Sequence, residues 1–191
     1  MRLPLFFFAA VLPAVLQGQV SGNCAAPFSA TVSPGSQLTM DIRSGDLEIV
    51  GSAAPGLRIT CRMRDEHAAS EVRISFAANH LRVHGGPNND FHIRVEVPEK
   101  TGLILRSPAG NLTVSGVAGN KDVELKAGNL MIQIANPGLY KVAEGSVMAG
   151  NLSADAFGIV KDGLFRNFRK ENPGGIYRLH ASVMAGDLIL K

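Results

Sequence analysis

Histidine supplies the cluster of side chains in this sequence whose types and spacing best suggest metal chemistry. His80 and His84 alternate along one segment, and His92 follows the Gly- and Asn-rich turn of residues 85–90. If the two segments form a hairpin, His84 and His92 lie opposite each other. Two imidazoles at that distance can hold zinc or copper, and Asp90 is the candidate third ligand.

A solvated polar face is the simpler explanation of these histidines. Arg82 and Arg94 alternate with them and would repel a cation. Calcium is not favoured either, because three of the five recurring turns described below carry Asn rather than Asp. The sequence therefore predicts no metal and no cofactor, with His84, His92 and Asp90 as the candidate ligands should one bind.

Catalytic signatures are absent from the sequence. It contains no Gly-x-Ser-x-Gly, His-Glu-x-x-His, phosphate loop or dinucleotide-binding glycine pattern. The acidic residues of the recurring segments are scattered singly: Asp46, Glu48, Asp122, Glu124, Glu144, Asp155 and Asp187. We expect no enzyme, and a small polysaccharide-acting enzyme is the alternative if carboxylates meet after folding.

The composition of the chain limits the classes of partner that we expect. The net charge is +3, from 19 basic and 16 acidic residues, which gives no electrostatic reason to expect nucleic acid. The chain has no Trp and two Tyr, so a sugar site built on aromatic faces is not expected. An unknown envelope protein or polysaccharide, or a second copy of the chain, is the expected partner.

The first 22 residues have the pattern of a secretory signal peptide. Arg2 precedes the apolar run of residues 3–16, which is too short for a comfortable membrane span. We expect cleavage between Gly18 and Asn23, and a mature domain of residues 23–191 without a transmembrane span. The protein is then periplasmic, secreted or on the cell surface. A retained membrane anchor and a lipid on Cys24 are the alternatives.

Cys24 and Cys61 are the only cysteines. In an oxidising compartment a single pair is most economically a disulfide, and metal binding by two isolated thiols is less plausible. The sequence therefore predicts a Cys24–Cys61 bridge from the start of the mature chain to a strand.

A short motif recurs through the chain. Ala-Gly-Asn-Leu ends at Leu112, Leu130 and Leu152, Ala-Gly-Asp-Leu ends at Leu188, and Ser-Gly-Asp-Leu ends at Leu47. The period is about 18 residues, and the longest interval leaves room for one missing turn near Phe168. The expected turn residues are Gly45, Gly110, Gly128, Gly150 and Gly186.

Each repeat is expected to form a strand, a tight turn and a second strand. Gly accepts a positive φ, Asn or Asp tolerates the left-handed region, and Leu begins the next inward row. Alternating segments such as Gln37–Ile42 and Leu57–Met63 also indicate strands. Stacking successive units gives an all-β solenoid of short strands, and a β-sandwich with the same turns is the alternative.

One segment interrupts the pattern. Residues 163–175 replace the missing copy with basic and aromatic side chains: Phe165, Arg166, Phe168, Arg169 and Lys170. They form either a loop for interaction with a partner or a loop that folds over an open edge of the stack. We favour the second.

With these turns and the preceding strand of residues 91–98, the chain resembles the bacterial putative-adhesin domain, an exported β-repeat family of largely undefined role. The resemblance runs from about Leu38 to Lys191, although Ala109, Ala127, Ala149 and Ala185 stand where that family usually has Ser or Thr. It implies a non-catalytic adhesin-like structural or interaction module of the cell envelope. A periplasmic metal- or ligand-binding sensing module is the alternative.

Overall fold

The computed structural model describes residues 18–43, 45–87, 90–161 and 164–191, so most of the predicted signal peptide lies outside the described residues. The described chain is all-β, as predicted. Its helices are short 3-10 segments: η1 (Glu66–Glu71), η2 (Pro137–Leu139) and η3 (Asp155–Phe157). Within these ranges no helix combines the length and the apolar character needed to span a membrane.

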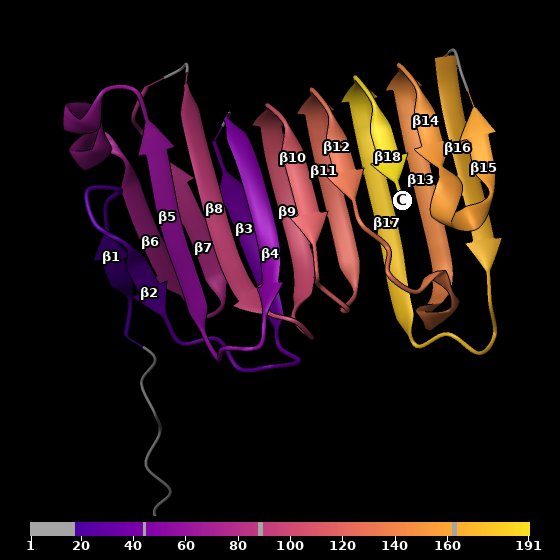
Figure 1. Ribbon diagram of the computed structural model, residues 1–191, viewed down its shortest axis with the longest axis horizontal. Coiled ribbons are helices and arrows are strands. Elements are labelled where there is room, and N and C mark those ends of the chain that lie inside the picture. The colour runs from indigo at the N-terminus through magenta and orange to yellow at the C-terminus, as the bar shows by residue number, and fades with distance from the viewer. Residues whose placement is uncertain (1–17, 44, 88–89, 162–163) are drawn as a thin grey trace, which may run out of the picture.

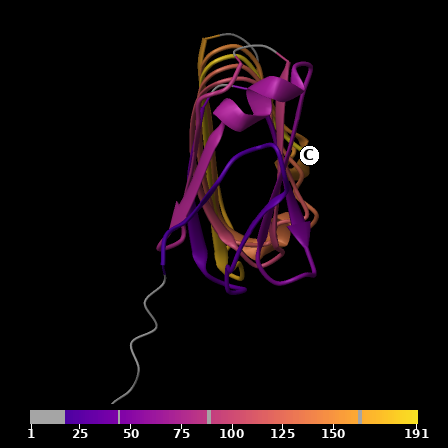
Figure 2. The ribbon, with the colours of Figure 1, turned by 90° about the vertical axis from the view of Figure 1, so that its left-hand side faces the viewer.

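The strands form two open, mixed sheets of nine strands each, which face each other across one apolar core (Figures 1 and 2). Sheet A contains, in spatial order, β1 (Val20–Gly22), β6 (Arg73–Ala77), β7 (His80–His84), β3 (Gln37–Ile42), β9 (Gly102–Ala109), β11 (Lys121–Ala127), β17 (Tyr177–Ala185), β13 (Tyr140–Ala149) and β16 (Leu164–Glu171).

Sheet B contains, from the opposite end, β15 (Ile159–Lys161), β14 (Leu152–Ala154), β18 (Leu188–Leu190), β12 (Leu130–Ile132), β10 (Leu112–Ser115), β4 (Asp46–Ser52), β8 (Phe91–Pro98), β5 (Leu57–Met63) and β2 (Phe28–Ala30). Two facing sheets are compatible with the sandwich alternative.

Strict alternation of apolar and polar residues explains why these segments form strands. In β11, Val123 and Leu125 are buried, whereas Asp122 and Glu124 point to solvent. Each repeat supplies one strand to sheet A and, after its turn, one strand to sheet B. Neighbouring repeats pair in parallel with their turns in register.

The repeats do not stack in chain order, which corrects the expectation that successive units are neighbours. The last pair, β17 and β18, lies between β11–β12 and β13–β14. Residues 146–152 and 182–188 are nearly identical and lie side by side, with Ser146 Oγ and Ser182 Oγ 3.0 Å apart. The turn that is missing from the 18-residue period near Phe168 therefore leaves no gap in the stack.

Antiparallel strands close both ends of the stack. β6 with β1 and β5 with β2 do so at one end, and β15 and β16 do so at the other (Figure 1). The expected loop at residues 165–170 is thus part of an edge strand. Its Phe168 is buried and packs on Phe157, with ring centroids 5.8 Å apart, so the segment does cover the end of the core.

Candidate functional site

The recurring turns form a continuous ladder along one edge of the stack. The glycines follow the spatial order Gly45, Gly110, Gly128, Gly186 and Gly150, and all five have positive φ. A Cβ atom added to Gly128 would lie 2.0 Å from the carbonyl oxygen of Gly110, and each later step of the ladder is equally tight. Both the conformation and the close approach of neighbouring backbones therefore require glycine here.

The residue after each glycine extends this ladder with side-chain hydrogen bonds. Asn111 Nδ2 donates to Asp46 Oδ1 at 2.9 Å, and Asn129 Nδ2 donates to Asn111 Oδ1 at 3.2 Å. Asn151 Nδ2 donates to Asp187 Oδ1 at 3.0 Å. These hydrogen bonds link neighbouring turns, so the Asn and Asp side chains have a structural role in the ladder.

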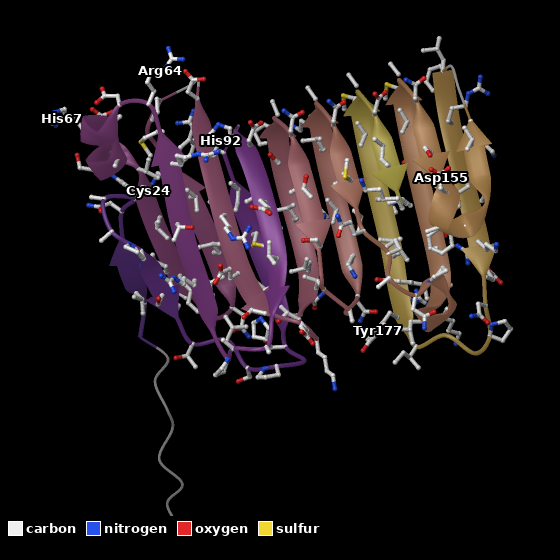
Figure 3. The ribbon with its side chains drawn as sticks, in the orientation of Figure 1. Cys24, Arg64, His67, His92, Asp155 and Tyr177 are labelled. Atoms are coloured by element: carbon white, nitrogen blue, oxygen red, sulfur yellow. A yellow bond between two sulfur atoms is a disulfide. The ribbon has the colours of Figure 1, made fainter. Side chains whose placement is uncertain are left out.

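The predicted pairing of His84 and His92 is wrong. His84 lies in β7 of sheet A and His92 in β8 of sheet B, so the two segments enter different sheets and form no hairpin. His92 Nδ1 lies 3.2 Å from Asp46 Oδ2, and Arg64 forms an ion pair with Asp90 at 3.2 Å. Figure 3 labels both His92, which lies in β8, and Arg64, which lies in the bend directly after β5. The structure does not bring the three candidate ligands together.

A band of charged side chains instead crosses the outer face of sheet A. We call it the charged band, and it consists of His80, Arg82, Asp41, Arg106, Asp122, Glu124, His180, Glu144 and Arg169. Basic side chains and carboxylates alternate from strand to strand and contact one another, from His80–Asp41 at 2.7 Å to Arg169–Glu144 at the far end. The band spans seven adjacent strands, β7 to β16.

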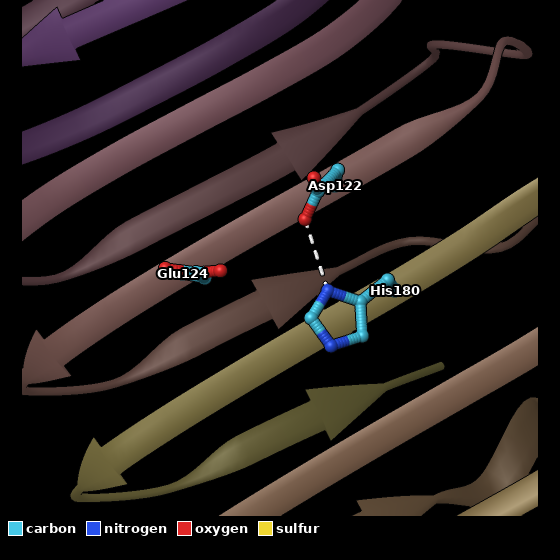
Figure 4. A group of neighbouring side chains, drawn as sticks. All are labelled: Asp122, Glu124 and His180. Carbon is cyan, nitrogen blue, oxygen red and sulfur yellow. Dashed lines mark hydrogen bonds and ion pairs between the residues drawn. The ribbon is translucent and has the colours of Figure 1, made fainter.

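The middle of the charged band holds three groups that could ligate a metal. Ligand atoms of Asp122, Glu124 and His180 all lie within 4.8 Å of one another. His180 Nδ1 lies 2.9 Å from Asp122 Oδ1 across neighbouring strands (Figure 4). The sequence did not predict this group, because His180 lies in β17, and β17 becomes a neighbour of β11 only by inserting between β11 and β13.

Arg106 neutralises this group from the next strand. Its guanidinium lies 2.8 Å from Asp122 Oδ2 and 3.2 Å from Glu124 Oε2. Partial burial acts to raise the pKa of Asp122, but hydrogen bonds from Arg106 and His180 outweigh it and hold that pKa below its usual range. A cation already occupies the carboxylates, so the arrangement is an ion-pair network rather than a vacant metal site.

The outer face of sheet B carries a shallow depression of about 500 Å³ over β4, β5, β8 and β10. Arg94 crosses it and pairs with Glu48 at 2.6 Å and Glu96 at 3.3 Å. His92 lies on its wall with Asp46. The depression is open, and most of its charged side chains are paired, which suits surface contact rather than chemistry on a small substrate.

The predicted disulfide is present. Cys24 and Cys61 are bonded, and the backbone N–H of Cys24 also donates to the carbonyl of Ala69. Together these contacts attach the N-terminal segment to β5 and η1, at the end of the stack that is farthest from β16 (Figure 3).

No protein-family model and no curated protein matches this chain. Among solved structures, it is similar to the crystal structure of a putative cell adhesion protein from Clostridium sporogenes ATCC 15579. The two chains are 13% identical and superpose with a TM-score of 0.51, and the match covers 87% of this chain and 98% of the other. At that identity the likeness shows a shared fold.

Proposed function

We propose that the protein is a non-catalytic, adhesin-like structural and interaction module of the bacterial cell envelope. The observation that carries this proposal is the charged band. A wide face on which basic side chains and carboxylates alternate is suited to recognising an extended partner through many weak polar contacts. The likeness to a protein described as a putative cell adhesion protein supports the same function.

We also propose export and a solenoid-like stack as parts of this function. The Cys24–Cys61 disulfide supports an oxidising compartment, and residues 1–22 supply the expected signal. Five turns linked by one ladder make the two sheets a stiff body, which suits a module that holds its binding face away from a surface.

The test is binding by the full chain after secretion from a bacterial host. The secreted protein is incubated with isolated envelope fractions and a panel of polysaccharides over a salt series, with and without zinc or calcium. We expect saturable binding to one component. Metal-dependent binding would favour the sensing module instead, and release of sugar products would favour an enzyme.

A matched pair of charge reversals assigns the binding face. Glu144 lies in the charged band and pairs with Arg169, whereas Glu48 lies on sheet B and pairs with Arg94. We expect Glu144→Lys to weaken binding about tenfold and Glu48→Lys to leave it unchanged. The opposite ranking would move the site to sheet B, and no binding by the folded chain would refute the proposal.

A further inference from the structure

The edge of sheet A at β16 differs from the other edges of the stack. Three of the four edge strands that the structure describes, β1, β2 and β15, contain three residues each. β16 contains eight, and among the described strands it pairs only with β13. A long edge strand is a template for pairing with another chain unless something prevents it.

The sequence of β16 is complementary to itself. Residues 164–170 read Leu-Phe-Arg-Asn-Phe-Arg-Lys. Counted outward from Asn167, every apolar residue on one side corresponds to a basic residue on the other. The matching pairs are Arg166 with Phe168, Phe165 with Arg169, and Leu164 with Lys170.

We propose that two copies of this chain form a dimer by antiparallel pairing of β16 with β16, with the twofold axis at Asn167 and perpendicular to sheet A. In this register Arg169 lies opposite Phe165 of the second copy, where a cation–π contact can form, and Phe165 departs from regular strand geometry with a φ of +52°. Phe165 and Leu164 are 73% and 64% exposed in the single chain, and the dimer covers both. This proposal does not depend on the envelope function.

Repulsion between like charges favours this register over the two adjacent registers. If the axis moved to Arg166, that residue would face its own copy. If the axis moved to Phe168, Arg166 would face Lys170 twice. Like charges directly opposite each other destabilise a strand pair, so the basic residues of β16 reject the shifted registers and permit the one centred on Asn167.

The rest of this end of the molecule is compatible with the pairing. β15 lies beside β16 in the facing sheet (Figure 1), so the same axis brings the exposed Val160 of each copy to the interface. The carbonyl oxygen of Asn167 accepts a hydrogen bond from Lys161 Nζ at 2.7 Å, and a neighbouring strand would take over that bond. The Nε atom of Arg166 is buried without a hydrogen-bond partner among the described residues, a cost that acceptors of a second copy can relieve.

Sedimentation of the full secreted chain over a concentration series tests the dimer, without any envelope ligand present. We expect a reversible dimer. Phe165→Lys should raise its dissociation constant at least about tenfold, because the added ammonium group lies opposite Arg169 of the second copy in this register. Met184→Lys is the control, since Met184 is also exposed but lies two strands away from the edge of sheet A.

Cross-linking gives a second readout that does not need the Phe165 variant to fold. Opposite residues in a hydrogen-bonded antiparallel pair have Cα atoms about 5.5 Å apart, within reach of a disulfide. Asn167→Cys should therefore give a covalent dimer on mild oxidation, and Ser182→Cys in the middle of sheet A should not. A monomer at all concentrations, a dimer unaffected by Phe165→Lys, or no cross-link at residue 167 would overturn the proposal.

Discussion

Lys121 places an ammonium group on the inward face of sheet A, in a row that the neighbouring strands fill with Leu103 and Leu179. Its Nζ donates to the carbonyl oxygen of Gly119 at 3.1 Å and to Tyr140 Oη at 2.5 Å. Burial lowers the pKa of Lys121 to about 8 and raises the pKa of Tyr140 to about 12. In both cases burial disfavours the charged form of the side chain.

This lysine should make stability rise with pH. Between about pH 8 and its usual pKa of 10.5, Lys121 is neutral in the folded chain and protonated in the unfolded chain. The unfolded state then binds more protons, so the free energy of unfolding increases by up to about 1.4 kcal/mol per pH unit. Urea unfolding at several pH values measures this slope, and Lys121→Met should remove it.

The raised pKa of Tyr140 limits this increase in the free energy of unfolding at higher pH. Above about pH 10 the unfolded chain loses the phenol proton while the folded chain keeps it, so stability should fall again. A flat profile from pH 8 to 10 in the wild-type chain would contradict the burial of the Lys121 ammonium.

Gly128 should tolerate no side chain. Its φ is +119°, and an added Cβ would collide with the backbone of Gly110. Gly128→Val should therefore destabilise the chain by about 3 kcal/mol or more. Gly158→Ala is the control, since Gly158 also has a positive φ but an added Cβ would meet nothing within 4 Å. Equal melting temperatures for the two variants would disprove the tight contact of the turns.

Removing Arg106 should convert its ion-pair network into a metal site. In Arg106→Gln the carboxylates of Asp122 and Glu124 lose their cation while His180 stays in place. Zinc should then raise the melting temperature of the variant and leave that of the wild-type chain unchanged. The additional change His180→Gln should abolish the response.

Residue types that act locally could be predicted from the sequence. The turn glycines and the Cys24–Cys61 pair depend on backbone conformation and compartment, which short motifs reveal. The Asp122–His180 contact could not be predicted, because it joins residues of strands that are distant in the chain and become neighbours only through the tertiary order of the repeats.

Among the elements, β18 lies in the interior of sheet B, between β12 and β14. Leu188 points into the core and is fully buried, whereas Ile189 faces outward. Leu188→Ala should cost about 2–5 kcal/mol and Ile189→Ala less than about 1.5 kcal/mol. Guanidinium unfolding of both variants checks the difference. Similar losses would show that the strand packs through both faces.

Most strands were predictable as elements, since alternation identifies Gln37–Ile42 and Leu57–Met63 directly. The hairpin between His84 and His92 was wrong because alternation does not reveal which sheet a strand joins. The segment around Phe168 was expected to be a loop because its basic residues break the repeat, yet pairing with β13 holds it extended.

At the scale of the whole molecule, the disulfide links the N-terminal segment to sheet B. It closes a loop of 37 residues, which corresponds to a stabilisation of about 3–4 kcal/mol by loop entropy. Thermal unfolding with and without a reductant should show this loss. The variant Cys24→Ser with Cys61→Ser should match the reduced protein and no longer respond to the reductant.

The fold class was predictable from the period of the turns, but the spatial order of the repeats was not. All five turn motifs are alike, so any of them can stack on any other, and the sequence does not state which neighbours they choose. Long-range pairing with β11 and β13 decides the position of β17.

The central position of β17 and β18 has a consequence for the timing of assembly. Synthesis delivers a chain from its N-terminus, so residues 177–191 emerge after the strands between which they lie. Until they emerge, β11 and β13 have no strand to join them. Both sheets therefore become continuous only after β17 and β18 have been inserted.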